Sequence, residues 1–372
     1  MRTWLRRLSV LQLCVLVVLA LVILLKGTRL VWYGFNYAQL ILRAVNSDEK
    51  RRADNLELLA QIQWDYSTLQ TRYMKQICED KGSERTDFTW LSALVNDEYV
   101  IPAVVLGHSI KTLSCVKKML VLVSDEVSKA SIHALERTGW SVKLVTAMDC
   151  RWLERKQGHM PASKGILGTH TRFHAWNYTQ YSKIIYADPD YMLLSNMDEL
   201  FHLSEDFAAA ECARAGMVDP CFNAGLLVFR PSYKDYKAIM ENWWTISLSD
   251  TCPNDQVLLW HLYADTGRWK PLPFAYNVRR LIHHPMKAFH FACCPPPKPW
   301  KEHCRPSSKE AKKFNGPLLS VHDATIMFWK MFYEAVRKYN LEEWWENTLF
   351  FKSDKEVNVK SYVECVQEWS LR

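Results

Sequence analysis

The sequence predicts an α/β fold in which a mostly parallel sheet is covered by helices on both faces. Short apolar, β-branched segments alternate with helical segments over residues 89–145, and a further buried strand is expected at Lys183–Ala187, directly before a cluster of polar residues. At 372 residues and 49% hydrophobic content, the chain can bury a full core. The alternation is typical of βαβ units.

The amino terminus predicts a membrane anchor. Residues 8–25 form an uncharged apolar run that is near the length needed to cross a bilayer. A cleaved signal peptide is disfavoured, because no small-x-small site ends the run and the interfacial aromatics Trp32 and Tyr33 follow it. We therefore expect residues 1–7 to be a cytoplasmic tail and the run to be a single-pass, type II signal anchor.

Residues 26–85 predict a helical stem. Apolar residues recur in it at alternating three- and four-residue steps, namely Leu59, Ile62, Tyr66, Leu69 and Tyr73. Two heptads do not establish a coiled coil, so two arrangements stay open. The stem packs on its own globular domain, or it pairs with the stem of a second copy to form a homodimer.

The globular part is expected to begin near residue 86. Strands are expected at residues 89–95, 118–123, 142–145 and Lys183–Ala187, and helices at residues 101–113 and 128–138. Ser124, Asp125 and Glu126 are expected to start the second of these helices as caps. The Pro-rich stretch at residues 295–299 predicts a loop, and residues 324–339 and 341–350 predict helices within a carboxyl-terminal extension at 306–372.

Charge and cysteine content narrow the class of protein. The net charge of +7 is spread out, with no basic run interleaved with aromatics, so nucleic acid is not an expected partner. Eleven cysteines suit an oxidising lumen, and they lack the Cys-x-x-Cys spacing of a zinc site. Their pairing cannot be deduced from spacing. The triplet beginning at Asn177 is a glycosylation acceptor sequence, which agrees with a luminal domain.

Asp188 and Asp190 are the first candidate functional residues. They fall just past the carboxyl end of the strand expected at Lys183–Ala187, where open α/β sheets place their ligands. Two carboxylates one residue apart can hold a hard divalent cation between themselves and phosphate oxygens. Taken alone, the Asp-Pro-Asp tripeptide is more often a turn that ends a strand.

Further motifs downstream favour the cation site over the turn. They are Cys-Phe-Asn-Ala-Gly at 221–225, Asn-Asp-Gln at 254–256, Leu-Pro-Phe-Ala-Tyr-Asn at 272–277, His-Phe at 290–291 and Lys-Pro-Trp at 298–300. In this order, and from about residue 89 to residue 300, the chain resembles the glycogenin-like enzymes of glycosyltransferase family 8. No one of these motifs is specific by itself.

The resemblance implies a GT-A fold, which is Rossmann-like, and a UDP-sugar donor. It also implies Mn²⁺ or another divalent cation, and transfer that retains the anomeric configuration. The implied cation ligands are Asp188, Asp190 and His290, since two carboxylates and a neutral imidazole suit manganese. Lys298 would neutralise the diphosphate as a point charge. The insertion of Cys293, Cys294 and prolines before Lys298 departs from the family spacing.

The remaining site residues follow from the same resemblance. Those implied to bind the donor are Asn96 and Tyr99 at the uridine, Arg172 at the phosphate or sugar, Asn223 at sugar hydroxyls, and Gly225, which would let the backbone approach closely. The implied catalytic residues are Asp255, which would touch sugar or acceptor hydroxyls, and Gln256, near the anomeric centre. Residues 281–285, which read Leu-Ile-His-His-Pro, offer no counterpart to glycogenin's self-glucosylated tyrosine.

These features predict a Golgi or endoplasmic reticulum membrane enzyme with a luminal catalytic domain at residues 86–305. It would move glucose, glucuronic acid, galactose or N-acetylglucosamine to a glycan, glycoprotein or glycolipid. One alternative is a catalytically degenerate, membrane-tethered protein that binds UDP-sugars or glycans. A phosphatase of the haloacid dehalogenase type would need Thr or Val where this chain has Met192.

Overall fold

A computed structural model describes residues 28–80, 86–150, 168–212, 221–247, 252, 254–292, 298–301 and 305–356. The chain packs as two units, Met1–Leu59 and Ala60–Arg372. The membrane span predicted at residues 8–25 lies outside the described residues. Within the described residues, none of the helices combines the length and the apolar composition that crossing a bilayer demands.

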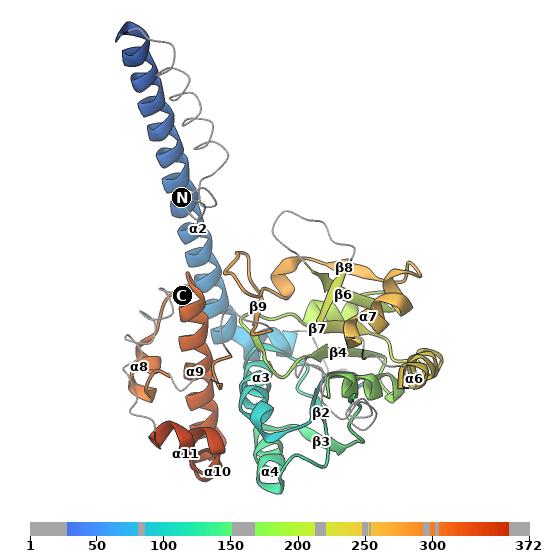
Figure 1. The fold of residues 1–372 in the computed structure, drawn as a ribbon. Helices are drawn as coiled ribbons and strands as arrows, with labels where there is room; N and C mark the ends of the chain where they lie inside the picture. The colour runs from blue at the N-terminus through green and yellow to red at the C-terminus, as the bar shows by residue number, and fades with distance from the viewer. Residues whose placement is uncertain are drawn as a thin grey trace. The chain divides into compact units, whose positions relative to one another are not determined.

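The centre of the second unit is a seven-stranded sheet with the order β3-β2-β1-β4-β7-β6-β8 (Figure 1). Its strands are β1 Phe88–Leu94, β2 Met119–Val123, β3 Ser141–Leu144, β4 Lys183–Ala187, β6 Phe207–Glu211, β7 Phe222–Phe229 and β8 Lys270–Leu272. The first four strands pair in parallel, β7 runs antiparallel to both β4 and β6, and β8 is parallel to β6. The predicted mostly parallel α/β sheet is therefore confirmed, with β7 as the antiparallel member.

Helices cover both faces of this sheet (Figure 1). The α-helices of the second unit beyond the stem are α3 Val100–Leu113, α4 Lys129–Thr138, α6 Tyr233–Ser247, α7 Asp255–Leu259, α8 Ser308–Lys313, α9 Val321–Lys338, α10 Glu342–Asn347 and α11 Leu349–Glu356. Shorter helical turns are η2 Asp97–Tyr99, η4 Thr169–Asn177, η5 Asp198–His202, η6 Trp260–Ala264 and η7 Phe274–Tyr276. Successive residues of β1 serve opposite cores, because Trp90 packs in the core that contains α3 and α9, and Leu91 in the core that contains η4 and α7.

The inner strands of the sheet are apolar because both of their faces are buried, whereas the edge strands β3 and β8 are mostly exposed. All five residues of β2 and all five of β4 are buried, which is the continuous pattern of a covered parallel sheet. The strands predicted at residues 89–95, 118–123 and 142–145 are each displaced by about one residue from those observed. Ile185 of β4 pairs with Trp90 on one side and Val228 on the other, which fixes the register at the end of β4.

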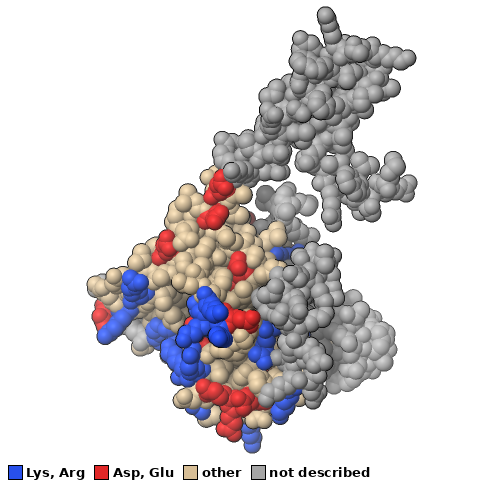
Figure 2. All heavy atoms as spheres, turned by 90° about the vertical axis from the view of Figure 1, so that its left-hand side faces the viewer, with Lys and Arg blue, Asp and Glu red and all other residues tan. Residues whose placement is uncertain are grey.

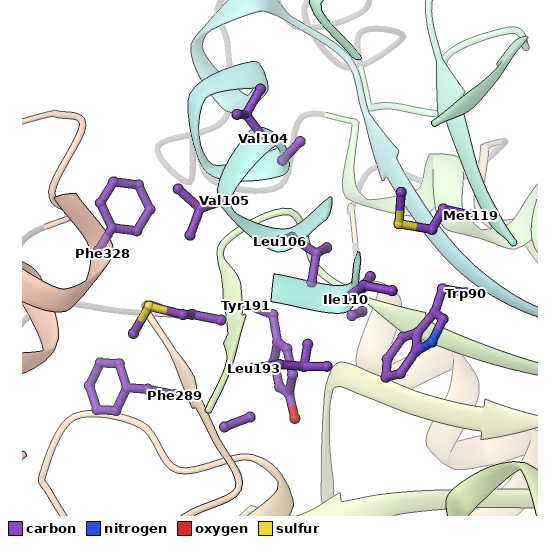
Figure 3. Packing of buried hydrophobic residues seen from close by; sticks show 14 of the residues in the cluster. Trp90, Val104, Val105, Leu106, Ile110, Met119, Tyr191, Leu193, Phe289 and Phe328 are labelled. Carbon is purple, nitrogen blue, oxygen red and sulfur yellow. The ribbon is translucent and has the colours of Figure 1, made fainter. Parts of the chain in front are cut away.

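Helix α3 is the central support of the first core. It is mostly apolar and is buried except at Lys111 and Thr112, as expected of a helix enclosed by protein. Figure 3 shows its side chains Val105 and Ile110 between Phe328 of α9 and Trp90 of β1. The layer formed by α9 therefore packs on α3 and not on the sheet itself.

Helix α4 begins later than the cap prediction placed it. Its N-cap is Ser128, whose side chain accepts a hydrogen bond from the backbone N–H of Ser131. Ser124 instead shapes the turn after β2, where its Oγ donates to the carbonyl of Val95 at 2.9 Å and accepts from the backbone N–H of Glu126. The expectation that Ser124 to Glu126 start the helix was wrong, because this serine is used within the turn.

A second, two-stranded sheet was not predicted. Strands β5 Tyr191–Leu193 and β9 Ala288–His290 pair antiparallel, with Tyr191 opposite His290. Both strands have three residues, which is too short for a periodic pattern to be read from sequence. This pairing brings residue 290 next to the segment that follows β4.

The stem is the helix α2 Thr28–Asp80. From Ala60 onward it packs on the globular unit, where Ser67 Oγ lies 2.7 Å from Ser195 Oγ and Gln70 Oε1 accepts from the backbone N–H of Asn196 at 2.8 Å. The apolar stripe on this part of the helix points elsewhere, since Ile62, Tyr66, Leu69 and Tyr73 are each at least half exposed. The stem therefore packs on its own globular unit while its apolar stripe stays exposed to solvent. Pairing of this stripe with the stem of a second copy stays a prediction.

Three disulfides join described residues: Cys78–Cys115, Cys150–Cys252 and Cys212–Cys221. The first ties the end of α2 to the loop after α3, and the second ties the chain beyond β3 to the segment before α7. The carboxyl-terminal helices carry an aromatic cluster in which Trp329 contacts Phe332 and Trp345. On the outer face of this region, Figure 2 shows basic and acidic side chains interspersed and no field of one sign.

Candidate active site

Asp188, Asp190 and His290 meet at the carboxyl end of β4. Nε2 of His290 lies 3.2 Å from Oδ1 of Asp190 and 3.6 Å from Oδ2 of Asp188. The two aspartates follow β4 directly, and β9 delivers the histidine through its pairing with β5. One ligand atom from each residue lies within 4.8 Å of the other two. The structure thus brings the three predicted cation ligands together from segments 100 residues apart.

The chemistry of these three residues fits a divalent cation. Burial raises the pKa of Asp188 above its ordinary value, and the positive charge of Arg172 only partly opposes this rise. Burial also acts to raise the pKa of Asp190, but Lys298 and His290 outweigh it and hold that pKa below its ordinary value. Two carboxylate oxygens and an imidazole nitrogen form a donor set that manganese accepts. A cation would relieve the repulsion between the two buried carboxylates.

Lys298 lies against this cluster and is not a solvated loop residue. Its Nζ donates to Oδ2 of Asp190 and, at 2.8 Å, to the carbonyl of Phe291. The ammonium group also lies 5.5 Å from the ring centroid of Tyr99 and 5.3 Å from that of Trp300. The wider spacing before Lys298 therefore does not keep its charge away from the aspartates.

Asn96 and Tyr99 follow the carboxyl end of β1, and the ring of Tyr99 lies beside Lys298. The side chain of Asn96 caps η2 by accepting from the backbone N–H of Tyr99 at 3.3 Å. Burial raises the pKa of Tyr99 to about 12, so its hydroxyl stays protonated at neutral pH. The Tyr99 ring meets Trp300 edge to face, with centroids 5.8 Å apart. An aromatic wall therefore stands next to the predicted diphosphate position.

Arg172 joins two carboxylates in the interior. Its Nη2 lies 2.9 Å from Oδ1 of Asp188, its Nε 3.0 Å from Oδ2 of Asp255, and its Nη1 donates to the carbonyl of Ala224 at 2.6 Å. Burial alone would lower the pKa of Arg172, but the two carboxylates outweigh it and raise that pKa. The guanidinium charge thus faces both carboxylates, and its Nε–H donates to the carbonyl of Thr169 at 3.0 Å. This bridging position was not predicted from the sequence.

Asp255 and Gln256 open helix α7, whose N-cap is Asn254. Oε1 of Gln256 accepts hydrogen bonds from Nδ2 of Asn223 at 2.9 Å and from the backbone N–H of Ala224 at 2.7 Å. These contacts hold the amino end of α7 against the amino end of β7. The predicted catalytic pair therefore lies beside the predicted donor residue Asn223.

Gly225 completes the set of predicted residues. Its carbonyl accepts from the backbone N–H of Asp188 at 2.9 Å, and its own N–H donates to Oδ1 of Asn223 at 3.1 Å. All eleven predicted residues belong to one connected region. The group at the aspartates and the group at Gln256 are linked by Arg172 and by the backbone of β7.

Two residues of this region were missed. Tyr186 donates its hydroxyl hydrogen to Oδ1 of Asp188 at 2.9 Å, and Asn277 contacts both Asn223 and His290. Asn277 ends the motif Leu-Pro-Phe-Ala-Tyr-Asn at 272–277, which was a usable signal. Tyr186 stands within an apolar strand and carried no such signal.

Sequence similarity to known proteins covers the part of the chain that holds this site. The model of the family described as glycosyl transferase family 8 matches residues 91–304. Glycogenin-1 from Mus musculus is 31% identical over 266 residues, which cover 66% of this chain and 76% of that protein. Inositol phosphorylceramide glucuronosyltransferase 1 from Arabidopsis thaliana is 29% identical over 184 residues, which cover 50% of this chain and 32% of that protein.

Similarity to solved structures is more distant. The galactosyltransferase LgtC, solved in complex with donor and acceptor sugar analogues, is 17% identical to this chain. The match covers 57% of this chain and 89% of LgtC, with a TM-score of 0.43.

Proposed function

Because this chain belongs to glycosyltransferase family 8, we propose that it is a retaining, divalent-cation-dependent hexosyltransferase that uses a UDP-sugar. The acceptor would be a glycan, glycoprotein or glycolipid. The observation that carries the proposal is the meeting of Asp188, Asp190 and His290 next to Lys298, at the carboxyl end of β4. This is the edge of an α/β sheet at which ligands bind.

The residues around the site have separate tasks in this proposal. Asp188, Asp190 and His290 would hold Mn²⁺, which supplies positive charge to the donor diphosphate when bound. The ring of Tyr99 would stack on the uracil. The ammonium group of Lys298, which donates to Asp190 in this structure, would instead bind a phosphate oxygen of the donor. A preorganised positive charge at the leaving group stabilises the negative charge that develops there.

Retention is proposed to proceed on one face of the sugar. As the bond between the anomeric carbon and the diphosphate oxygen breaks, the acceptor oxygen forms its bond from the same side. The acceptor proton passes to the departing diphosphate. The alternative is a covalent intermediate on an enzyme carboxylate. Asp255 is buried and paired with Arg172, which makes it a poor nucleophile and favours the first route.

Compartment and assembly are also proposed. Three disulfides favour an oxidising compartment, and we propose a luminal domain in the Golgi or endoplasmic reticulum, anchored through residues 8–25. The exposed stripe of Ile62, Tyr66 and Leu69 supports pairing of two stems. Light scattering of the full-length protein in detergent tests this pairing, and Ile62→Asp should shift a dimer to a monomer.

The test of function is a donor screen. Full-length protein purified in detergent is incubated with UDP-glucose, UDP-glucuronate, UDP-galactose or UDP-N-acetylglucosamine, and UDP release is measured. One donor should be hydrolysed in Mn²⁺ and not in EDTA. UDP binding without hydrolysis or transfer of any donor would instead favour a binding protein.

A further inference from the structure

Gln256 and His290 are joined by a continuous line of hydrogen bonds through Asn223 and Asn277. Nδ2 of Asn223 lies 2.9 Å from Oε1 of Gln256, and Nδ2 of Asn277 lies 2.8 Å from Oδ1 of Asn223. The line ends where Oδ1 of Asn277 lies 3.0 Å from Nδ1 of His290. Asn277 and His290 are both buried, so water does not compete for these groups.

Two backbone N–H groups fix the direction of this line. The N–H of Ala224 points to the side-chain amide of Gln256 at 2.7 Å, and the N–H of Gly225 points to that of Asn223 at 3.1 Å. A backbone N–H can only donate, so the atom facing it must be the amide oxygen. The orientation of both amides follows from the hydrogen-bond network.

The same logic reaches Asn277 and then His290. Because Oδ1 of Asn223 faces Asn277, that residue must present its NH₂ group to Asn223 and its oxygen to the imidazole. An amide oxygen only accepts, so Nδ1 of His290 carries the hydrogen. In the neutral imidazole the lone pair then lies on Nε2, the atom that faces Asp188 and Asp190.

We infer that Asn277 is a positioning residue that holds His290 in the tautomer required of a cation ligand. The inference rests on the proposed cation-dependent function. A ligating histidine generally donates its other ring N–H to a fixed acceptor, which sets the ring orientation.

At the other end of this line of hydrogen bonds, only the side-chain oxygen of Gln256 is used. Its Nε2 has no hydrogen-bond partner among the described residues. This NH₂ group is therefore available to a sugar hydroxyl.

Two variants of Asn277 separate this role from packing. Asn277→Leu has a similar shape but offers no acceptor to His290. Asn277→Asp keeps the acceptor and loses the donor toward Asn223. Mn²⁺ binding to the full-length protein is followed by the electron paramagnetic resonance signal of free Mn²⁺. The dissociation constant should rise by roughly 10–100-fold in Asn277→Leu and stay within a few-fold of wild type in Asn277→Asp.

The matched control is Asn242→Leu, an exposed asparagine on α6, which should bind Mn²⁺ as wild type does. The thermal unfolding midpoint of each variant checks its folding. If Asn277→Leu does not fold, Asn277→Asp and the metal-free wild type decide the question. In the ¹⁵N spectrum of wild-type protein labelled at histidine, the signal that is lost in His290→Gln should be that of an Nδ1–H tautomer.

The possible failures can be told apart. Equal Mn²⁺ affinity in wild type and folded Asn277→Leu, or an Nε2–H tautomer for His290, would overturn the role of Asn277 alone. Loss of Mn²⁺ affinity in Asn277→Asp equal to that in Asn277→Leu would also overturn it, because the acceptor would then not matter. Absence of Mn²⁺ binding to the wild type would overturn the proposed cation site itself.

Discussion

The imidazole of His290 occupies the space that a side chain on Gly225 would need. An ideal β-carbon at Gly225 would lie 2.0 Å from Cε1 and 2.3 Å from Nδ1 of His290. The family resemblance implied that this glycine, as a donor-binding residue, lets the backbone approach closely. The structure gives a reason within the chain itself: β7 must pass next to the ring of a proposed cation ligand.

Gly225→Ala should therefore displace His290 and weaken Mn²⁺ binding. Overpacking of a filled interior costs about 1–3 kcal/mol, so the free energy of unfolding should fall by that amount as well. Isothermal titration with Mn²⁺ and urea unfolding measure the two effects. Gly316→Ala is the control, because a β-carbon there meets no atom within 4 Å. Unchanged Mn²⁺ affinity in Gly225→Ala would contradict the contact.

Asp190→Asn tests the cation site with little change of shape. Loss of a residue behind the ligands typically costs about 10–100-fold, so loss of a ligand should reduce Mn²⁺-dependent UDP release by more than roughly 100-fold. Turnover is measured at saturating donor over a range of Mn²⁺ concentrations. Asp206→Asn, a substitution of an exposed aspartate, should leave turnover unchanged. Wild-type turnover in Asp190→Asn would remove Asp190 from the site.

Arg172→Lys keeps the charge and removes the fork between Asp188 and Asp255. We expect kcat/KM for the donor to fall at least about tenfold, since one ammonium cannot replace the guanidinium at both carboxylates. Arg172→Met would leave two buried carboxylates without their partner and should cost about 3–5 kcal/mol in urea unfolding. Arg230→Lys, at an exposed ion pair, serves as the control. Equal kinetics in Arg172→Lys and wild type would show that charge alone suffices.

Protonation of Asp235 at low pH should lower the free energy of unfolding of the protein. Burial would raise the pKa of Asp235, but hydrogen bonds from Arg268 at 2.8 and 2.9 Å outweigh it, and the pKa lies below its ordinary value. A lowered folded-state pKa stabilises the protein above the unfolded value of about 3.9, and this stabilisation is lost as pH falls through the folded value.

Asp235→Asn should accordingly lower the free energy of unfolding at pH 7, and its difference from wild type should shrink below about pH 4. Urea unfolding at a series of pH values measures both. Asp265→Asn, an exposed carboxylate, is expected to change little at any pH. A difference for Asp235→Asn that stays constant from pH 7 to pH 3 would rule out the linkage.

The Cys78–Cys115 disulfide should stabilise the packing of α2. It closes a loop of 37 residues, for which chain entropy predicts about 3–4 kcal/mol. Cys78→Ser should lower the free energy of unfolding by up to that amount, and non-reducing peptide mapping should recover the bond in wild type. Detection of both cysteines as free thiols in the folded protein would contradict the pairing.

Much of the first half of the sheet could be predicted from sequence. Strands β1, β2 and β4 are buried on both faces, so each one reads as a largely apolar run, whereas the edge strand β3 is mostly exposed. The switch to antiparallel at β7 could not be predicted in this way, because a buried strand looks the same in either direction. The three-residue strands β5 and β9 carry no periodicity at all.

The site shows the same division. The cluster of Asp188, Asp190 and His290 could be predicted because their residue types and motif order point to one chemistry, and the structure brings the three together. The position of Arg172 between two carboxylates and the hydrogen bonds of Asn277 to Asn223 and His290 could not be predicted, because they depend on which atoms face one another in the folded chain. A motif names a residue and does not give its orientation. Disulfide pairing has the same limit: the chain has eleven cysteines, and even the six that pair here could be joined in fifteen ways.

The distance along the chain between Asp190 and His290 has a consequence for biosynthesis. During translation both aspartates leave the ribosome long before the histidine does, because 100 residues separate Asp190 from His290. Until β9 has been made and has paired with β5, the carboxylates have no imidazole beside them. A truncated product that stops before residue 288 would carry the two aspartates and still lack the site. In the proposed function, cation binding would therefore require a chain that extends past His290.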